Sequence, residues 1–178
     1  MVEKYVPKYK VRVMTSDDLE RVLLWRNHPD VRRFMFTQHE ISLDEHSQWF
    51  GRASKDSRKH LLIFETNNVP QGFIHVTEIG HRVADWGFYI APDAPRGSGF
   101  QLGLAAINFA FEVVGLHKLC GQALEFNERS IKFHLRMGFQ QEGSLRDQHY
   151  DGINYHTVVC FGLLEHEWKK ISESIEHE

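Results

Sequence analysis

The most constraining feature of the sequence is a glycine-rich turn between an extended apolar segment and a long helical one. Residues 82–90 are extended, a loop rich in proline and glycine ends in Arg96-Gly97-Ser98-Gly99, and residues 100–114 carry apolar side chains at helical spacing. Glycines let backbone N–H groups converge, and the positive end of a helix dipole favours an anion. The pattern therefore predicts a phosphate-binding turn, with a plain surface turn that caps a helix as the alternative.

The remaining pattern predicts a mixed domain. Strands are expected over 9–14, 60–65, 71–79 and 116–124, helices over 15–27, from 42 and over 127–137, and a hairpin over 141–150 and 154–164 with a two-residue turn at Asp151-Gly152. A last helix over 165–171 is followed by an expected loose tail over 172–178. The order indicates one α/β (α+β) domain over residues 1–178, with a mostly antiparallel central sheet flanked by helices.

Composition excludes several function classes. The net charge of −3 gives no electrostatic footprint for nucleic acid. No apolar run has the length of a membrane span, and no signal peptide is expected. Cys120 and Cys160 lie in apolar runs, which excludes a disulfide framework and favours a cytoplasmic setting. The 12 histidines raise the question of a metal, but no His-x-x-x-His pair or Cys cluster has ligand spacing, so no metal is expected.

A second motif extends the glycine-rich turn into a family pattern. Asn127-x-x-Ser130-Ile131 opens the helix over 127–137, and Gly138-Phe139 ends it. With the Arg-Gly-x-Gly turn and the closing hairpin, this order resembles the GNAT superfamily of N-acetyltransferases over nearly the whole chain. The superfamily motif is Gln/Arg-x-x-Gly-x-Gly/Ala, whereas this chain has Gln101 in the last place. The resemblance implies acetyl-CoA as co-substrate.

The resemblance also implies where the cofactor lies. Backbone amides of residues 96–101 cradle its pyrophosphate, Gly103 lets the helix approach it, and Asn127 contacts the pantetheine arm. A splayed strand, here residues 87–90, supplies the N–H that holds the developing oxyanion. The cofactor-binding residues expected are Phe88, Tyr89, Ile90, Arg96, Gly97, Ser98, Gly99, Phe100, Gln101, Gly103, Asn127 and Ser130.

Three residues are candidates for proton transfer. His134 stands where the superfamily commonly carries a tyrosine that protonates the departing thiolate, and an imidazole that titrates near neutrality can do the same. The alternative for His134 is a locally bonded histidine on a helix face. Glu78 and Glu125 are candidate bases that act through water, or else solvated surface carboxylates.

The first helices carry a narrower resemblance. Trp25-Arg26-Asn27, residues 116–123, Leu145-Arg146-x-Gln-His149 and residues 151–163 look like the UDP-4-amino-4,6-dideoxy-N-acetyl-β-L-altrosamine N-acetyltransferases of pseudaminic acid biosynthesis, over about residues 10–164. A nucleotide-sugar acceptor is therefore expected, with aromatic faces for the uracil and donors for the diphosphate. The acceptor-binding residues expected are Arg26, Met35, Phe36, His46, Trp49, Phe50 and Tyr89. Trp49 and Phe50 alternatively anchor their helix to the sheet.

Two other functions stay open from the sequence. Trp-Arg-Asn at a helix end is shared with ribosomal-protein acetyltransferases, so an N-terminal amine of a protein is an alternative acceptor. A CoA-binding module without turnover is supported only by Gln101 and His134, which depart from the family pattern. The exposed edge of the closing hairpin makes a homodimer plausible, and no nucleic-acid or membrane partner is expected. The roles of His117, His149 and His156 are unassigned.

Overall fold

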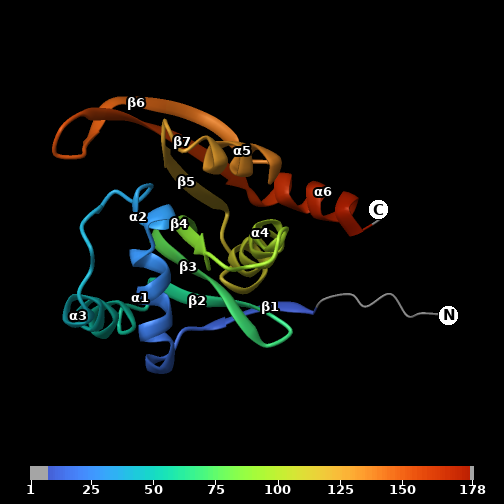
Figure 1. Cartoon of the computed structure of the whole chain (residues 1–178). Coiled ribbons are helices and arrows are strands. Elements are labelled where there is room, and N and C mark those ends of the chain that lie inside the picture. Colours follow the sequence, from blue (N-terminus) through green and yellow to red (C-terminus); the bar gives the residue numbers. More distant parts are fainter. Residues whose placement is uncertain (1–7, 177–178) are drawn as a thin grey trace.

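The computed structural model describes residues 8–176 and is built on one twisted seven-stranded sheet (Figure 1). The strand order is β1-β2-β3-β4-β5-β7-β6, and only the β4–β5 pair is parallel. The strands are β1 (Tyr9–Val13), β2 (Lys59–Thr66), β3 (Val69–Gly80), β4 (Val83–Ile90), β5 (Lys118–Leu124), β6 (Gln140–Tyr150) and β7 (Tyr155–Leu164). The expected mixed class with a mostly antiparallel sheet is confirmed.

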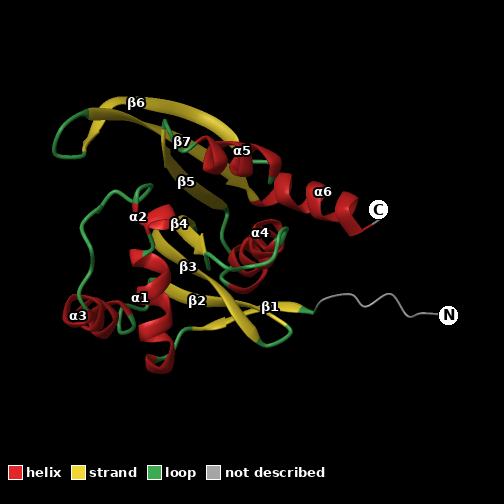
Figure 2. Cartoon of the chain, viewed as in Figure 1, coloured by secondary structure: helices red, strands yellow, loops and turns green. Residues whose placement is uncertain are grey.

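Two groups of helices cover the two faces of the sheet (Figure 2). α4 and α5 pack with the sheet around one core, which includes Trp86, Leu102 and Phe161. α1 and α3 pack around a second core, which includes Trp25 and Phe73. The helices are α1 (Leu19–Asn27), α2 (Pro29–Arg32), α3 (Leu43–Ala53), α4 (Ser98–Asn108), α5 (Glu128–Arg136) and α6 (Glu165–Glu176), with a 3-10 turn η1 (Ser16–Asp18) and a π turn η2 (Phe109–Val113).

Local chemistry explains several of these boundaries. The Thr15 N–H donates to the Asp18 carboxylate at 2.9 Å, and Arg12 holds the same buried carboxylate at 2.7 and 2.8 Å. Ser42 caps α3 by accepting from the Glu45 N–H at 3.1 Å. Asn67 and Asn68 both adopt positive φ, which turns the chain between β2 and β3.

Three sequence expectations need correction. The tail is not loose from residue 172, because α6 continues to Glu176 and is held by buried Trp168, whose Nε1 donates to Asn108 Oδ1 at 2.7 Å. The rest of that expected tail, 177–178, lies outside the described residues. The helix expected over 100–114 ends as an α-helix at Asn108 and continues as η2. The hairpin connection is longer than two residues, because Asp151 Oδ1 accepts from both the Ile153 and Asn154 N–H groups at 2.8 Å.

No helix within the described part of the chain is both long and apolar enough to cross a bilayer.

Candidate active site

A gap in the sheet between β4 and β5 organises the candidate site (Figure 1). The β4–β5 ladder consists of three residue pairs and ends at Asp85–Cys120, after which the strands diverge. The Ala91 N–H donates to Gln71 O of β3 at 2.8 Å. Counting back from Ala91, every second N–H group of β4 therefore points to β3. Because successive N–H groups of a strand point to opposite edges, those of Trp86, Phe88 and Ile90 face the gap. The splayed strand expected from the family resemblance is therefore present.

The N-terminus of α4 forms an open cradle beyond the end of β4. Gly97 has φ 94°, and its carbonyl accepts from the N–H groups of Phe100 and Gln101 at 3.1 and 3.3 Å. Ser98 is buried and its hydroxyl donates to Gln71 Oε1 at 3.1 Å, which ties the turn to β3. A Cβ added at Gly97 or Gly99 would meet nothing within 4 Å. The helix dipole, the open space and the exposed Arg96 beside it fit a pyrophosphate.

Gly103 has a different role from the expected one. A Cβ at this position would lie 2.8 Å from Phe133 Cζ and 3.0 Å from Met137 Cε, both on the α5 side. The missing side chain therefore lets α4 and α5 pack closely, rather than letting α4 approach a cofactor.

The N-terminus of α5 lies at the end of β5, on the other side of the gap. Asn127 Oδ1 accepts from the Ser130 N–H at 3.2 Å and caps the helix, which leaves the side-chain amide as a donor. The rings of Phe88 and Phe133 lie 4.8 Å apart, and Ile90 packs on the same core. Phe88 and Ile90 thus offer their backbone, not their side chains, to the gap.

His134 occupies the core below α5 and has no free ring nitrogen. Its Nδ1 lies 2.8 Å from the Ser130 carbonyl, and its Nε2 lies 3.2 Å from Trp86 Nε1. A carbonyl can only accept and an indole N–H can only donate, so the ring is neutral with its proton on Nδ1. Burial lowers the pKa of His134 to about 4. This geometry disagrees with the expected acid role, because Nε2 carries no proton at neutral pH.

The two candidate bases both form hydrogen bonds within the protein. Glu78 Oε1 pairs with His60 Nε2 at 2.9 Å, and the His60 ring contacts Phe109 of η2. Glu78 therefore lies at the far end of β3, where it pairs with Ala84 before the strands diverge. Glu125 follows β5 and accepts from the Thr157 N–H at 3.1 Å, so it braces the start of the hairpin. Glu78 is therefore separated along the strand from the β4 groups that face the gap, whereas Glu125 lies two residues before Asn127 at the end of β5.

Three expected acceptor residues do meet on the α1–α3 face. Arg26 of α1 donates from Nη2 to Thr37 O at 2.6 Å, while its buried Nη1 has no partner among the described residues. Burial lowers the pKa of Arg26, and Tyr89 acts on this pKa in the opposite direction. His46 is buried, stacks on Trp49 at 5.2 Å and also leaves Nε2 without a partner in the described chain. Burial also lowers the pKa of His46, and it raises the pKa of Tyr89.

The expected aromatic residues separate into two groups. Trp49 and Phe50 pack against the second core, with the Trp49 and Phe73 rings 5.9 Å apart, which favours their anchoring role. Phe36 is 46% exposed and meets His149 of β6 edge-on at 5.3 Å, and Met35 precedes it in the same loop. Phe36 therefore marks where the loop between α2 and α3 reaches the hairpin.

The hairpin also holds two histidines that the sequence left without a role. His156 Nε2 lies 2.6 Å from Asp151 Oδ2, and the His149 ring stacks 6.4 Å from His156. Hydrogen bonds from the Asn154 backbone and from His156 lower the pKa of Asp151 to about 2. The pairing of His149 with His156 across the hairpin depends on a bulge between Leu145 and His149, which no sequence pattern predicts.

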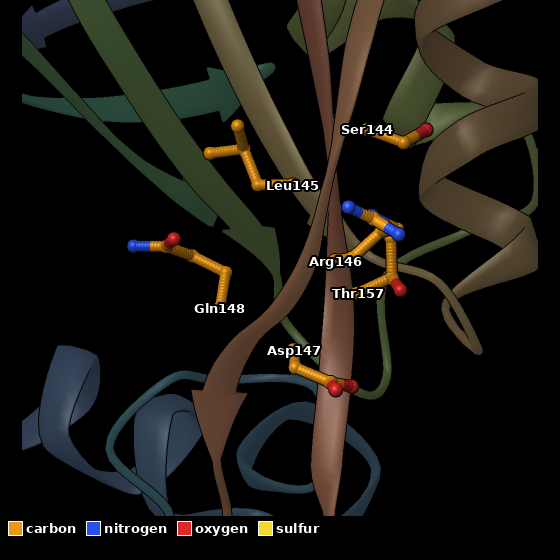
Figure 3. A pocket seen from close by; sticks show the side chains of 6 residues that line it. All are labelled: Ser144, Leu145, Arg146, Asp147, Gln148 and Thr157. Atoms are coloured by element: carbon orange, nitrogen blue, oxygen red, sulfur yellow. The ribbon is translucent and has the colours of Figure 1, made fainter.

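An open hollow lies on the hairpin at the same bulge (Figure 3). It is lined by Ser144, Leu145, Arg146, Asp147, Gln148 and Thr157. Asp147 has φ 52°. Residues 146–148 lie between the pairs Leu145–Val158 and His149–His156, and they are opposite Thr157 alone. None of the three β4 residues whose N–H groups face the gap lines this hollow. Among residues 8–176, no group of three His, Cys, Asp or Glu side chains is placed to hold a metal ion.

Comparisons with known proteins agree with this arrangement. The family described as "Acetyltransferase (GNAT) domain" matches residues 9–140. "Acetyltransferase PseH" of Campylobacter jejuni is 28% identical over 138 residues, 77% of this chain and 86% of that protein. "Spermidine N(1)-acetyltransferase" of Escherichia coli is 24% identical over 162 residues, 89% and 87% of the two chains. The structure of spermidine N-acetyltransferase from Vibrio cholerae with CoA and spermine superposes with a TM-score of 0.83 at 22% identity, covering 90% of this chain and 98% of that one.

Proposed function

The chain belongs to the acetyltransferase (GNAT) family, and we propose that it acetylates the amino group of a nucleotide-linked amino sugar. The family makes it an N-acetyltransferase that uses acetyl-CoA. The proposed acceptor is the 4-amino group of UDP-4-amino-4,6-dideoxy-N-acetyl-β-L-altrosamine, in pseudaminic acid biosynthesis. The relative named PseH and the acceptor-like pattern around Arg26 support this choice over other amines.

The chain's own groups divide the work around the gap. N–H groups at the start of α4 and the Arg96 side chain bind the pyrophosphate, and the Asn127 amide orients the pantetheine arm. Acetyl-CoA supplies the thioester. The Phe88 N–H, which faces the gap, donates to the charge that develops on the thioester oxygen as the amine attacks. Cofactor binding thus relies mainly on backbone groups, which tolerate a change such as Gln101.

The observation that carries the acceptor proposal is the buried Nη1 of Arg26. A buried N–H without an acceptor costs free energy on the order of 1–3 kcal/mol, so such a donor is retained where a ligand supplies the acceptor. Arg26 already uses Nη2 on Thr37 O, which fixes the orientation of the guanidinium. His46 Nε2 offers a second unpartnered nitrogen in the same region. Oxygen-rich, anionic acceptors satisfy these groups, whereas a polyamine brings more positive charge.

The test is thiol release from acetyl-CoA with a panel of amines. The amino UDP-sugar should give release that saturates at low concentration, and spermidine and a ribosomal N-terminal peptide should give little. Release with spermidine or with the peptide alone would overturn the sugar assignment while leaving the N-acetyltransferase activity in place. Release with none of the three would point to another amine acceptor.

A homodimer is part of the same proposal. β6 ends the strand order of the sheet, and its side chains are exposed along most of their length. An exposed edge of 11 residues offers unpaired backbone groups to a second copy. A dodecameric structure is known for the spermidine N-acetyltransferase of Vibrio cholerae, so assembly occurs in this fold. Light scattering on wild-type protein and on a Gln141→Pro variant tests it, since proline removes an N–H donor of the edge strand.

A further inference from the structure

His75 lies beside the part of β4 that borders the gap, although no motif marks it. It is on β3, directly opposite Gly87 of β4. A Cβ added at Gly87 would lie within contact distance of three His75 ring atoms, at 3.0 Å from Cε1, 3.1 Å from Cδ2 and closer still to Nε2. The imidazole therefore lies across Gly87, and only glycine leaves room for it there.

Gly87 lies on the part of β4 that borders the gap. The β4–β5 ladder has ended two residues earlier at Asp85, and the neighbouring Trp86 and Phe88 N–H groups point into the gap. Gly87 and Tyr89 alternate with Trp86 and Phe88, so their side-chain positions face the α1–α3 side. The cofactor cradle at α4 is on the opposite side. An amine that approaches the thioester from the acceptor side therefore passes the His75 ring.

The His75 ring is also chemically available. Neither ring nitrogen forms a hydrogen bond with any residue in the described range 8–176, and the ring is partly buried beside Phe73, 6.3 Å away. His134, in contrast, uses both nitrogens on protein partners. The charged group that influences His75 is Lys59 of β2, and Asp85 is the acidic side chain that shares its side of β4. Burial, with a smaller effect of Lys59, lowers the pKa of His75 to about 4 and keeps the ring neutral.

We propose that His75 is the general base of the acetyl transfer. The amine nitrogen bonds to the thioester carbonyl carbon, the C–S bond breaks, and the sulfur leaves as a thiolate that takes a proton from water. The nitrogen becomes strongly acidic as the C–N bond forms, so its proton passes to a His75 ring nitrogen and then to water. A weakly basic imidazole is sufficient for this late transfer. The assignment rests on the acetyl transfer of the family and not on the identity of the acceptor.

Chemical rescue distinguishes a base from a structural residue. His75→Ala leaves an opening beside Gly87, and we expect kcat to fall about 100-fold with the KM for acetyl-CoA unchanged. Added imidazole should restore the rate in proportion to its neutral form. The assay uses whichever amine of the panel gives turnover, or ethanolamine at high concentration if none does. A His75→Ala variant that keeps its rate, or whose loss imidazole does not restore, would overturn the proposal.

Two controls separate folding from chemistry. His75→Gln keeps most of the ring volume and cannot accept a proton as imidazole does, so it should show the same loss with unchanged thermal unfolding. His60→Gln changes a histidine of the adjacent strand whose ring contacts η2 on the other face, and it should keep full activity. Independently of any amine, nitrogen NMR of the His75 ring should shift on addition of CoA. An unmoved resonance with CoA bound would place His75 away from the gap and contradict the proposal.

Discussion

The two faces of the sheet at the β4–β5 gap are built in different ways. On the α4–α5 face, two consecutive strand–turn–helix units bring Arg96 and Asn127 to the ends of neighbouring parallel strands. On the α1–α3 face, Arg26, His46 and His75 come from three separate elements. The first face presents mainly backbone groups, and the second presents side chains. A cofactor site made of backbone can survive sequence change, whereas an acceptor site made of side chains can change its substrate.

The faces also differ in how their polar groups are satisfied. On the α4–α5 face, His134 is buried and both of its nitrogens are bonded, to Ser130 and Trp86. On the α1–α3 face, Arg26 Nη1 and His46 Nε2 are buried without partners among the described residues. Because an unmade buried hydrogen bond is costly, the first arrangement stabilises the fold and the second is suited to a ligand.

The largest expected effect tests the structural role of His134. His134→Ala removes a ring stacked 4.8 Å from Phe161 and leaves the Trp86 N–H without an acceptor. We expect a loss of about 4 kcal/mol in the free energy of unfolding, as for other large-to-small core changes. Urea unfolding followed by Trp fluorescence measures it.

A matched substitution at the same position separates packing from hydrogen bonding. His134→Phe keeps a ring in the stack and loses only the two hydrogen bonds, so about 2 kcal/mol should be lost. Its kcat, corrected for the folded fraction, should stay near that of the wild type. A specific loss of kcat in a folded His134→Phe protein would restore the acid role and contradict the structural one.

The next effect is a dependence of stability on pH. The folded pKa of His134 is about 4, below its usual value of 6.5, because burial disfavours the charged ring. Between these values the unfolded chain binds more protons, so the stabilisation is complete above pH 6.5 and is lost as pH falls toward 4. The loss is up to about 3 kcal/mol for a shift of this size.

His75, whose pKa burial also lowers to about 4, should add a contribution of the same sign. Urea midpoints measured across this range test both contributions. The slope should weaken in His134→Phe, and an unchanged slope in that variant would show that His134 is not the group responsible.

How much the sequence reveals differs between the two faces for a physical reason. The glycine-rich turn and the Asn127 cap are local, and glycine conformation and helix capping are decided within a few residues. The fold class follows from the order of such elements. The meeting of His75 with Gly87 depends on the pairing register of β3 and β4, which no short motif encodes. Only the glycine in Trp86-Gly87-Phe88 hinted that something packs closely there.

The structure differs from the expectations for Gly103 and His134 for a common reason. Each expectation rests on a position in or next to a family motif, yet the surroundings of each residue are set by side chains from another element. Phe133 and Met137 fill the space beside Gly103, and Trp86 of β4 bonds to His134. A position in a motif therefore predicts the backbone well and predicts the chemistry of a buried side chain poorly.

A smaller effect is expected at the acceptor face. Arg26→Gln removes the unpartnered N–H and the contact with Thr37, so the KM for an oxygen-rich acceptor should rise about 30-fold, equivalent to about 2 kcal/mol. The KM for acetyl-CoA should not change, because its cradle is on the other face. Arg52→Gln, on exposed α3 surface, is the control and should leave both constants unaltered. A rise confined to the KM for acetyl-CoA would show that Arg26 serves the cofactor and not the acceptor, and would contradict the prediction.

The smallest expected effect tests the cofactor cradle, at a glycine whose space is open. Gly99→Ala adds a methyl group that meets nothing in the protein, so helix stability should increase by about 0.5 kcal/mol. The same methyl group occupies the cradle, so the KM for acetyl-CoA should rise about tenfold, or about 1.4 kcal/mol. Gly51→Ala in α3 has equally open surroundings and should stabilise the protein without changing that KM. Stability and affinity must therefore move in opposite directions at Gly99 alone, and an unchanged KM in Gly99→Ala would move the pyrophosphate away from α4.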